Sequence, residues 1–237
     1  MSESGRYWLR VWVIDLPDAL RRACLVCIIA GVAIVLAIVP SVSDANAQIL
    51  WNLTPEESAD VRRIEDYLNG IKTMQARFTQ INPDGSSAQG TLHIQRPGSL
   101  RFDYDPPDSY LIVANGVWFI YIDRELQQVS HIPLRQTLAW FLVRDPISLT
   151  DGVSITRFER GPGTMRVSFV KSDEPESGSV TFALSDHPLQ LKSWSITDPQ
   201  RQDTRVTIDS PKFGLALDPE LFRFIAPPEW ADREQEG

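Results

Sequence analysis

The three histidines are the side chains of this sequence best suited to catalysis or metal binding, and their spacing fits neither role. His93, His131 and His187 lie far apart, and the cysteines, Cys24 and Cys27, are remote from all of them. The sequence also has no G-x-S-x-G motif, no phosphate-binding glycine loop and no dinucleotide fingerprint. We therefore expect no catalytic residues, no metal and no cofactor.

Aromatic side chains carry more information than the titratable ones. Many of them alternate along predicted strands, which places them on one face of a sheet. With their aliphatic neighbours, these residues are Phe78, Leu100, Phe102, Tyr104, Trp118, Ile120, Phe158, Phe169, Phe182 and Trp194. They either fill the core of a β-barrel or line a cavity for an apolar ligand, and a barrel of more than roughly eight strands is wider than side chains alone fill.

The first 47 residues have the composition of an export signal. Four arginines precede the uncharged apolar run Ala23–Val39, which is followed by Pro40 and the small-residue triplet Ala45-Asn46-Ala47. This order predicts a secretory signal peptide cleaved after Ala47. An uncleaved membrane anchor and a twin-arginine signal at Arg21-Arg22 are the alternatives.

Charge and cysteine content then describe the exported part, residues 48–237. Both cysteines lie within the apolar run, so the exported part has no disulfides and depends on its core alone. The formal net charge of −8 belongs wholly to this part, because the leader is neutral. A nucleic-acid or anionic-membrane binder needs a basic face, and we expect neither partner.

Two segments of the exported part are predicted to be helical. Thr54-Pro55-Glu56-Glu57 has the residues of a capped helix start, with proline at the first helical position. A second, shorter helix is predicted over Pro133–Arg144. Their apolar stripes at helical spacing are Val61, Ile64, Leu68 and Ile71 in the first helix, and Leu134, Leu138, Phe141 and Leu142 in the second.

The remainder of the chain follows a two-residue period interrupted by turn residues, of which Asn115-Gly116 is the strongest hairpin signal. The count predicts about eleven short strands in one antiparallel sheet curled into a barrel. No linker divides residues 48–237, so we expect a single, mainly β (α+β) domain. The predicted strands are Met74–Ile81, Gly90–Gln95, Leu100–Tyr104, Tyr110–Ala114, Val117–Ile122, Leu126–His131, Val153–Arg160, Thr164–Lys171, Ser179–Leu184, Leu189–Thr197 and Thr204–Asp209.

A set of short motifs from Met74 to Pro228 resembles the outer-membrane lipoprotein carrier proteins, the LolA family. Each motif is weak alone, but together they occur in the family's order at matching spacing. The motifs are Ala76-Arg77-Phe78-Thr79-Gln80, Gly90-Thr91-Leu92, Arg96-Pro97, Leu100-Arg101-Phe102, Pro106-Pro107, Leu111–Gly116 with Trp118 after it, and Phe222–Pro228.

This resemblance implies an unclosed antiparallel β-barrel with a helical lid, in a periplasmic, non-enzymatic, monomeric carrier. Such carriers take acylated lipoproteins that an ATP-driven (ABC) transporter releases from the inner membrane, and deliver them to the outer membrane, with an outer-membrane receptor as a further candidate partner. The family's lid-holding arginine corresponds to Arg96, which would hydrogen-bond backbone carbonyls. The aromatic set would line the acyl-chain cavity, and the two helical stripes would be the lid.

Three alternatives remain open at this point. The first is a related barrel that binds or senses another lipid, such as a glycolipid. The second is a structural β-domain with a filled core, in which both helices are ordinary core elements. The third is a hydrolase whose residues only folding brings together.

Overall fold

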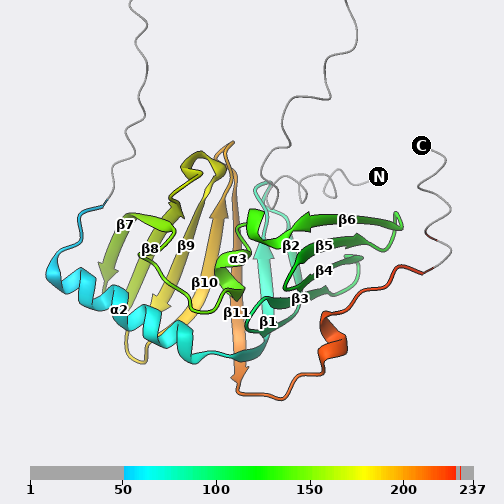
Figure 1. Ribbon diagram of the computed structural model, residues 1–237, viewed down its shortest axis with the longest axis horizontal. Helices are drawn as coiled ribbons and strands as arrows, with labels where there is room; N and C mark the ends of the chain where they lie inside the picture. Colours follow the sequence, from blue (N-terminus) through cyan, green and yellow to red (C-terminus); the bar gives the residue numbers. More distant parts are fainter. Residues whose placement is uncertain (1–50, 228–229, 231–237) are drawn as a thin grey trace, which may run out of the picture.

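The computed structural model describes residues 51–227 and 230, which build one open antiparallel sheet of eleven strands (Figure 1). The spatial order is β6-β5-β4-β3-β2-β1-β11-β10-β9-β8-β7, so two meanders join where β1 pairs with β11. The predicted antiparallel sheet is confirmed. The strands are β1 Thr73–Ile81, β2 Ser87–Gln95, β3 Ser99–Tyr104, β4 Tyr110–Asn115, β5 Trp118–Asp123, β6 Gln128–Pro133, β7 Val153–Gly161, β8 Thr164–Lys171, β9 Ser179–Ser185, β10 Gln190–Thr197 and β11 Asp203–Phe213.

The first helix, α2 (Pro55–Gly70), begins as its sequence predicts. The Thr54 hydroxyl accepts a hydrogen bond from the Glu57 amide, and the Glu57 carboxylate accepts one from the Thr54 amide at 2.8 Å. Its apolar stripe is buried, whereas no basic residue stands in its last turn. The last carbonyls of α2 therefore need a partner from elsewhere in the fold.

The predicted helix over Pro133–Arg144 is wrong in extent. The segment forms a 3-10 turn, η3 (Leu134–Gln136), and one short helix, α3 (Trp140–Val143). Thr137 separates them, because its backbone is extended and its hydroxyl donates to the Leu134 carbonyl at 2.8 Å. The four apolar residues predicted for this helix, Leu134, Leu138, Phe141 and Leu142, are nevertheless buried, as is the apolar stripe of α2.

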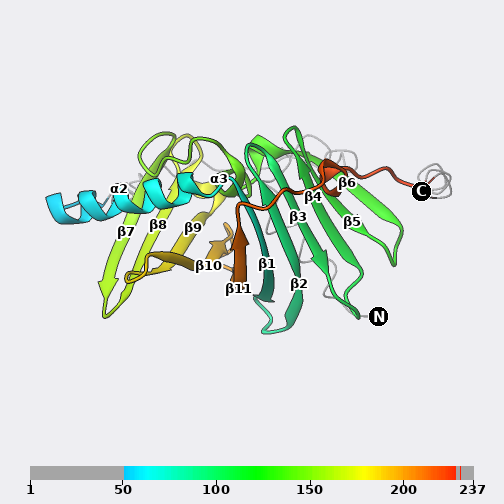
Figure 2. The same ribbon diagram turned by 90° about the horizontal axis from the view of Figure 1, so that it is seen from below.

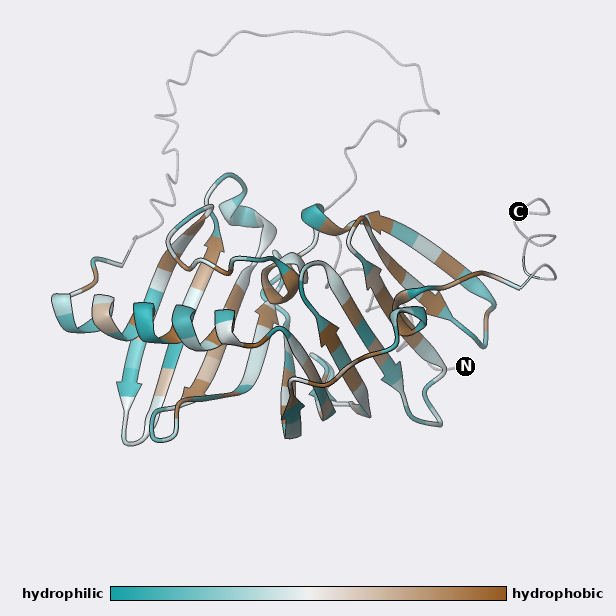
Figure 3. Ribbon diagram, turned by 60° about the horizontal axis from the view of Figure 1, so that its bottom comes forward, coloured by the Kyte–Doolittle hydropathy of each residue, from teal (hydrophilic) through white to brown (hydrophobic). Residues whose placement is uncertain are grey.

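Each face of the sheet carries a different cover. The inner face, defined as the one whose side chains form a single core with α2 and α3, extends over both meanders. Figure 2 shows the strands in two walls that meet near β11 and β1, with α2 crossing β7–β9. The outer face of β4 and β5 has a smaller apolar cluster that packs with Phe224 and Trp230, after the 3-10 turn η5 (Pro219–Phe222). Figure 3 shows apolar residues, in brown, at intervals along the strands of both walls, as a sheet with an apolar inner face requires.

Two further expectations concern membranes and export. Within the described residues no helix combines the length and apolar character needed to cross a membrane. The predicted signal peptide and its cleavage after Ala47 lie outside the described residues.

Candidate functional site

Most of the predicted cavity residues come together on the inner face. None of them is more than 4% exposed, and several rings pack edge to face, with Phe78 and Phe102 centroids 5.0 Å apart. The sheet thus presents a continuous apolar surface to the two helices. These residues are Phe78, Leu100, Phe102, Tyr104, Phe158, Phe169, Phe182 and Trp194.

Trp118 and Ile120 do not belong to this set, and their assignment to the cavity is wrong. Both lie on the outer face, where Ile120 joins the smaller cluster and Trp118 is 41% exposed. The inner-face residues of β5 are Phe119 and Tyr121. Both faces of β5 are apolar because the C-terminal segment covers the outer one. Alternation alone therefore cannot show which side chains of this strand face the core.

The predicted lid residues pack into the same core. In α3, the Phe141 ring lies edge-on to Phe169, with centroids 5.3 Å apart. The apolar side chains of sheet and helices therefore contact one another directly and shield the inner face from water. The buried residues contributed by the helical segments are Val61, Ile64, Leu68, Ile71, Leu134, Leu138, Phe141 and Leu142.

Arg96, in the turn between β2 and β3, connects both helical segments to the sheet. Its Nε donates to the Leu142 carbonyl at 2.9 Å, and its Nη1 donates to the carbonyls of Ile71, at 2.9 Å, and Leu68. Burial lowers the pKa of Arg96 to about 10, against the opposing effect of Asp145, so the guanidinium is still charged at neutral pH. Arg96 thereby supplies the positive charge that the C-terminal end of α2 lacks.

A ring of four charged side chains attaches α2 to the sheet nearer its N-terminal end. Sequence reasoning missed this ring. Arg63 donates to Asp60 at 2.7 Å and to Asp186 at 3.0 Å, and Arg160 contacts the remaining oxygen of each carboxylate. The ring joins α2 to β7 and to the turn after β9. The available signal was Asp60 itself, an acidic residue four positions before Ile64 on the apolar side of the helix.

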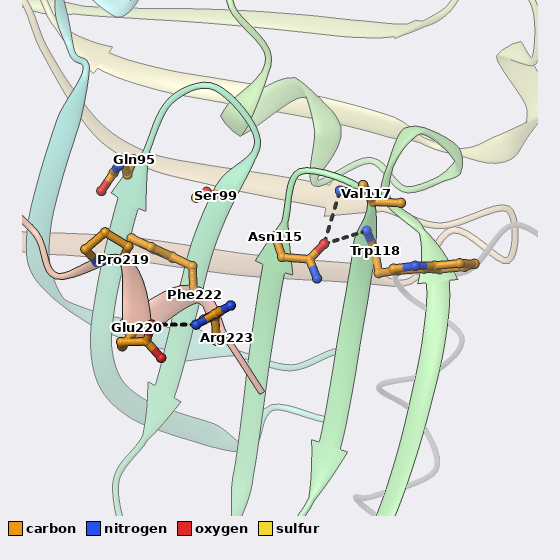
Figure 4. A pocket seen from close by; sticks show the side chains of 9 residues that line it. All are labelled: Gln95, Ser99, Asn115, Val117, Trp118, Pro219, Glu220, Phe222 and Arg223. Carbon is orange, nitrogen blue, oxygen red and sulfur yellow. Dashed lines mark hydrogen bonds and ion pairs between the residues drawn. The ribbon is translucent and has the colours of Figure 1, made fainter. Parts of the chain in front are cut away.

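A separate pocket of about 590 Å³ opens where η5 meets the β4–β5 turn (Figure 4). The Asn115 side chain accepts hydrogen bonds from the amides of Val117 and Trp118, at 3.1 and 2.9 Å, and Glu220 pairs with Arg223. Its lining is mixed, with several polar and charged side chains, so it suits an acyl chain less well than the inner face does. No three His, Cys, Asp or Glu side chains within the described ranges lie close enough to hold a metal ion.

Comparison with known proteins identifies the family. Residues 69–225 match the family described as "Outer membrane lipoprotein carrier protein LolA". The chain belongs to this family. Among curated relatives, the outer-membrane lipoprotein carrier protein of Methylococcus capsulatus is 30% identical over 190 residues, covering 76% of this chain and 90% of the relative. The protein of the same description from Pseudomonas aeruginosa PAO1 is 31% identical over 183 residues, covering 73% and 86%.

The solved structures found in the comparison are more distant in sequence. The crystal structure of a LolA superfamily protein from Nitrosomonas europaea is 10% identical, with a TM-score of 0.42, and the alignment covers 69% of this chain and 97% of that one.

The contacts of Arg96 lead to a first prediction for this carrier-family member. Arg96→Met removes three hydrogen bonds to carbonyls that are shielded from water, and we expect the free energy of unfolding to fall by about 3 kcal/mol. Amide exchange should accelerate at the C-terminal end of α2 and in α3. Arg166→Met is the matched control, because Arg166 is 61% exposed and 3.9 Å from Glu159. Unchanged exchange in Arg96→Met would contradict a fastening role.

The charged ring leads to a prediction about pH. The hydrogen bond from Arg63 holds the pKa of Asp186 below its ordinary value of 3.8. A carboxyl with a lowered pKa contributes stability above its ordinary pKa and loses it as the pH falls through the lowered one. Asp186→Asn should therefore lower the thermal midpoint by a few degrees at pH 7, and the difference should shrink as the pH falls below 3.8. Asp173→Asn, at an exposed position, is the control, and a pH-independent difference would refute the assignment.

Proposed function

We propose that this protein is a periplasmic carrier that binds the acyl chains of lipoproteins released from the inner membrane and delivers them to the outer membrane. The observation that carries this proposal is the inner face, an apolar surface wider than the strands can cover themselves. Its cover consists of helical segments attached through polar contacts such as those of Arg96, which can break and re-form. Membership of the carrier family supports the same role.

The energetics of the cargo require such a cover. Exposing an acyl chain to water costs about 0.8 kcal/mol per methylene group, which is on the order of 10 kcal/mol for one chain. A lipoprotein cannot diffuse between membranes at that cost unless a protein shields the chain. The carrier must also release the chain, so it has to bind more weakly than a membrane does. A lid that packs into the binding surface provides this, because the ligand must displace it.

In this proposal α2 and the segment Leu134–Val143 form the lid, Arg96 holds it closed, and the inner-face residues contact the acyl chains. The remaining parts follow from the same role. The inner-membrane ABC transporter supplies the cargo, a monomer suffices for transport, and the net charge of −8 keeps the free carrier from adhering to anionic membranes. Binding and release need no catalytic residue.

Capture of the natural cargo is the direct test. We expect the full-length protein, purified from the periplasm of its host, to carry acylated lipoproteins that mass spectrometry identifies from their lipid-modified N-terminal peptides. Trp118→Ala is the matched control, because this exposed aromatic residue lies on the outer face and should not affect recovery. Recovery of a free glycolipid alone would establish the first alternative, a barrel for another lipid.

Weakening the lid should strengthen binding, which separates a carrier from a filled structural domain. Leu138→Ala removes apolar contacts that only the closed form makes, with a cost to that form of about 2–5 kcal/mol. Because about 1.4 kcal/mol corresponds to a tenfold change in affinity, we expect a fluorescent fatty-acyl probe to bind at least about tenfold more tightly to Leu138→Ala than to the wild type. Gln136→Ala, an exposed position in the same segment, should bind like the wild type. A folded Leu138→Ala variant with weaker or unchanged binding would contradict the lid assignment.

A further inference from the structure

Some polar atoms on the inner face are buried without a hydrogen-bond partner among the described residues, and two of them belong to aromatic side chains. They are the Tyr121 hydroxyl and the Trp194 indole nitrogen, and the two side chains belong to residues that are 6% and 1% exposed. A buried polar group without a partner costs free energy, so proteins rarely keep one on their own account. Both atoms are on the surface that we assign to the ligand.

An unbroken run of aromatic rings connects the two residues across the sheet. Tyr121 stacks on Tyr110, with centroids 5.7 Å apart, and Tyr104 lies edge-on to Tyr110 at 6.2 Å. Phe102 follows, 6.4 Å from Tyr104 and 6.3 Å from Trp194. The unpartnered atoms thus belong to the two ends of one aromatic surface, not to unrelated parts of the core.

The middle of this run already shows how a polar group is accommodated there. The Tyr104 hydroxyl donates to the Gln80 carboxamide oxygen at 3.0 Å, and Gln80 is fully buried. Gln80 in turn donates to the Asn82 side chain at 2.8 Å. The inner face can therefore satisfy a neutral carbonyl oxygen with a tyrosine hydroxyl in the absence of water.

The chemistry of the unpartnered atoms restricts the ligand. An indole nitrogen can only donate, so its partner must be an acceptor, and a tyrosine hydroxyl can donate to the same kind of group. Acidic side chains lie beside the tyrosines: burial and then Asp108 raise the pKa of Tyr104, and Asp123 contributes to the raised pKa of Tyr121 after burial and Tyr110. These carboxyl groups disfavour an anionic group such as a phosphate, and leave a neutral carbonyl as the fitting acceptor.

We propose that Tyr121 and Trp194 donate hydrogen bonds to the ester or amide carbonyls through which acyl chains are attached, so that the inner face recognises the acyl linkage as well as the hydrocarbon. The proposal rests on the carrier function and adds a specificity determinant to it. A ligand with the same chains but no carbonyl would leave both donors unpaired.

The test compares two neutral probes on the full-length protein: a peptide carrying two ester-linked acyl chains, and the same peptide carrying ether-linked alkyl chains of equal length. We expect the wild type to bind the ester probe about fivefold more tightly than the ether probe. Tyr121→Phe should reduce this preference, leave the affinity for the ether probe near the wild-type value, and not lower the stability of the free protein. Trp194→Phe should also reduce the preference.

The matched control is Tyr67→Phe, which removes another tyrosine hydroxyl. That hydroxyl accepts a hydrogen bond from the Leu191 amide at 3.1 Å, so its loss should affect stability and leave the ester preference intact. Equal binding of both probes by the wild type, or an unchanged preference in both Tyr121→Phe and Trp194→Phe, would overturn the carbonyl subsite alone. Failure of the wild type to bind either probe would overturn the carrier function with it.

Discussion

An apolar sheet face that the strands cannot cover is the constraint on which the rest of this structure depends. The two meanders share one junction, β1 with β11, and β6 and β7 remain as open edges. A sheet that closed into a narrow barrel would bury its inner face against itself. Here the face stays wide, and the chain has to supply separate helical segments to shield it. In the proposed function, these same segments form the lid that a ligand displaces.

Polar contacts at defined points attach these segments, while apolar packing provides the burial. Arg96 contacts carbonyls of both α2 and α3, and the charged ring around Asp60 attaches the other half of α2. Asn69 exchanges two hydrogen bonds, both 2.8 Å, with the backbone of Ile147, which links α2 to the loop after α3. The two covering segments are thus connected to each other as well as to the sheet. A movement of one of them must alter the contacts of the other.

The parts of this arrangement that the sequence predicts are those that local pattern determines. The capping residues of α2, the strand alternation and the Asn115-Gly116 turn all involve neighbours in the chain, and so do the motifs that resemble the carrier family. Local pattern cannot decide which side chains of β5 face inward, because that depends on a C-terminal segment that covers the outer face of the strand. Because the sequence prediction assigns Trp118 and Ile120 to the inner face of β5, it leaves Tyr121 out of the predicted cavity. The charged ring is equally non-local, since Arg63 and Asp186 are 123 residues apart.

If the proposed function and the proposed carbonyl subsite both hold, the buried polar atoms add a second component to the energetics of loading and release, besides apolar packing. Packing of the lid opposes every ligand equally, since any acyl chain must displace the same side chains. Unpaired donors act differently, because they cost free energy in the closed form and are satisfied only by a ligand with an acceptor in the right place. A carrier that combines both can hold its cargo less tightly than a membrane and still distinguish an acylated protein from other hydrocarbon chains. Selectivity then comes from a few hydrogen bonds, and ease of release comes from the lid.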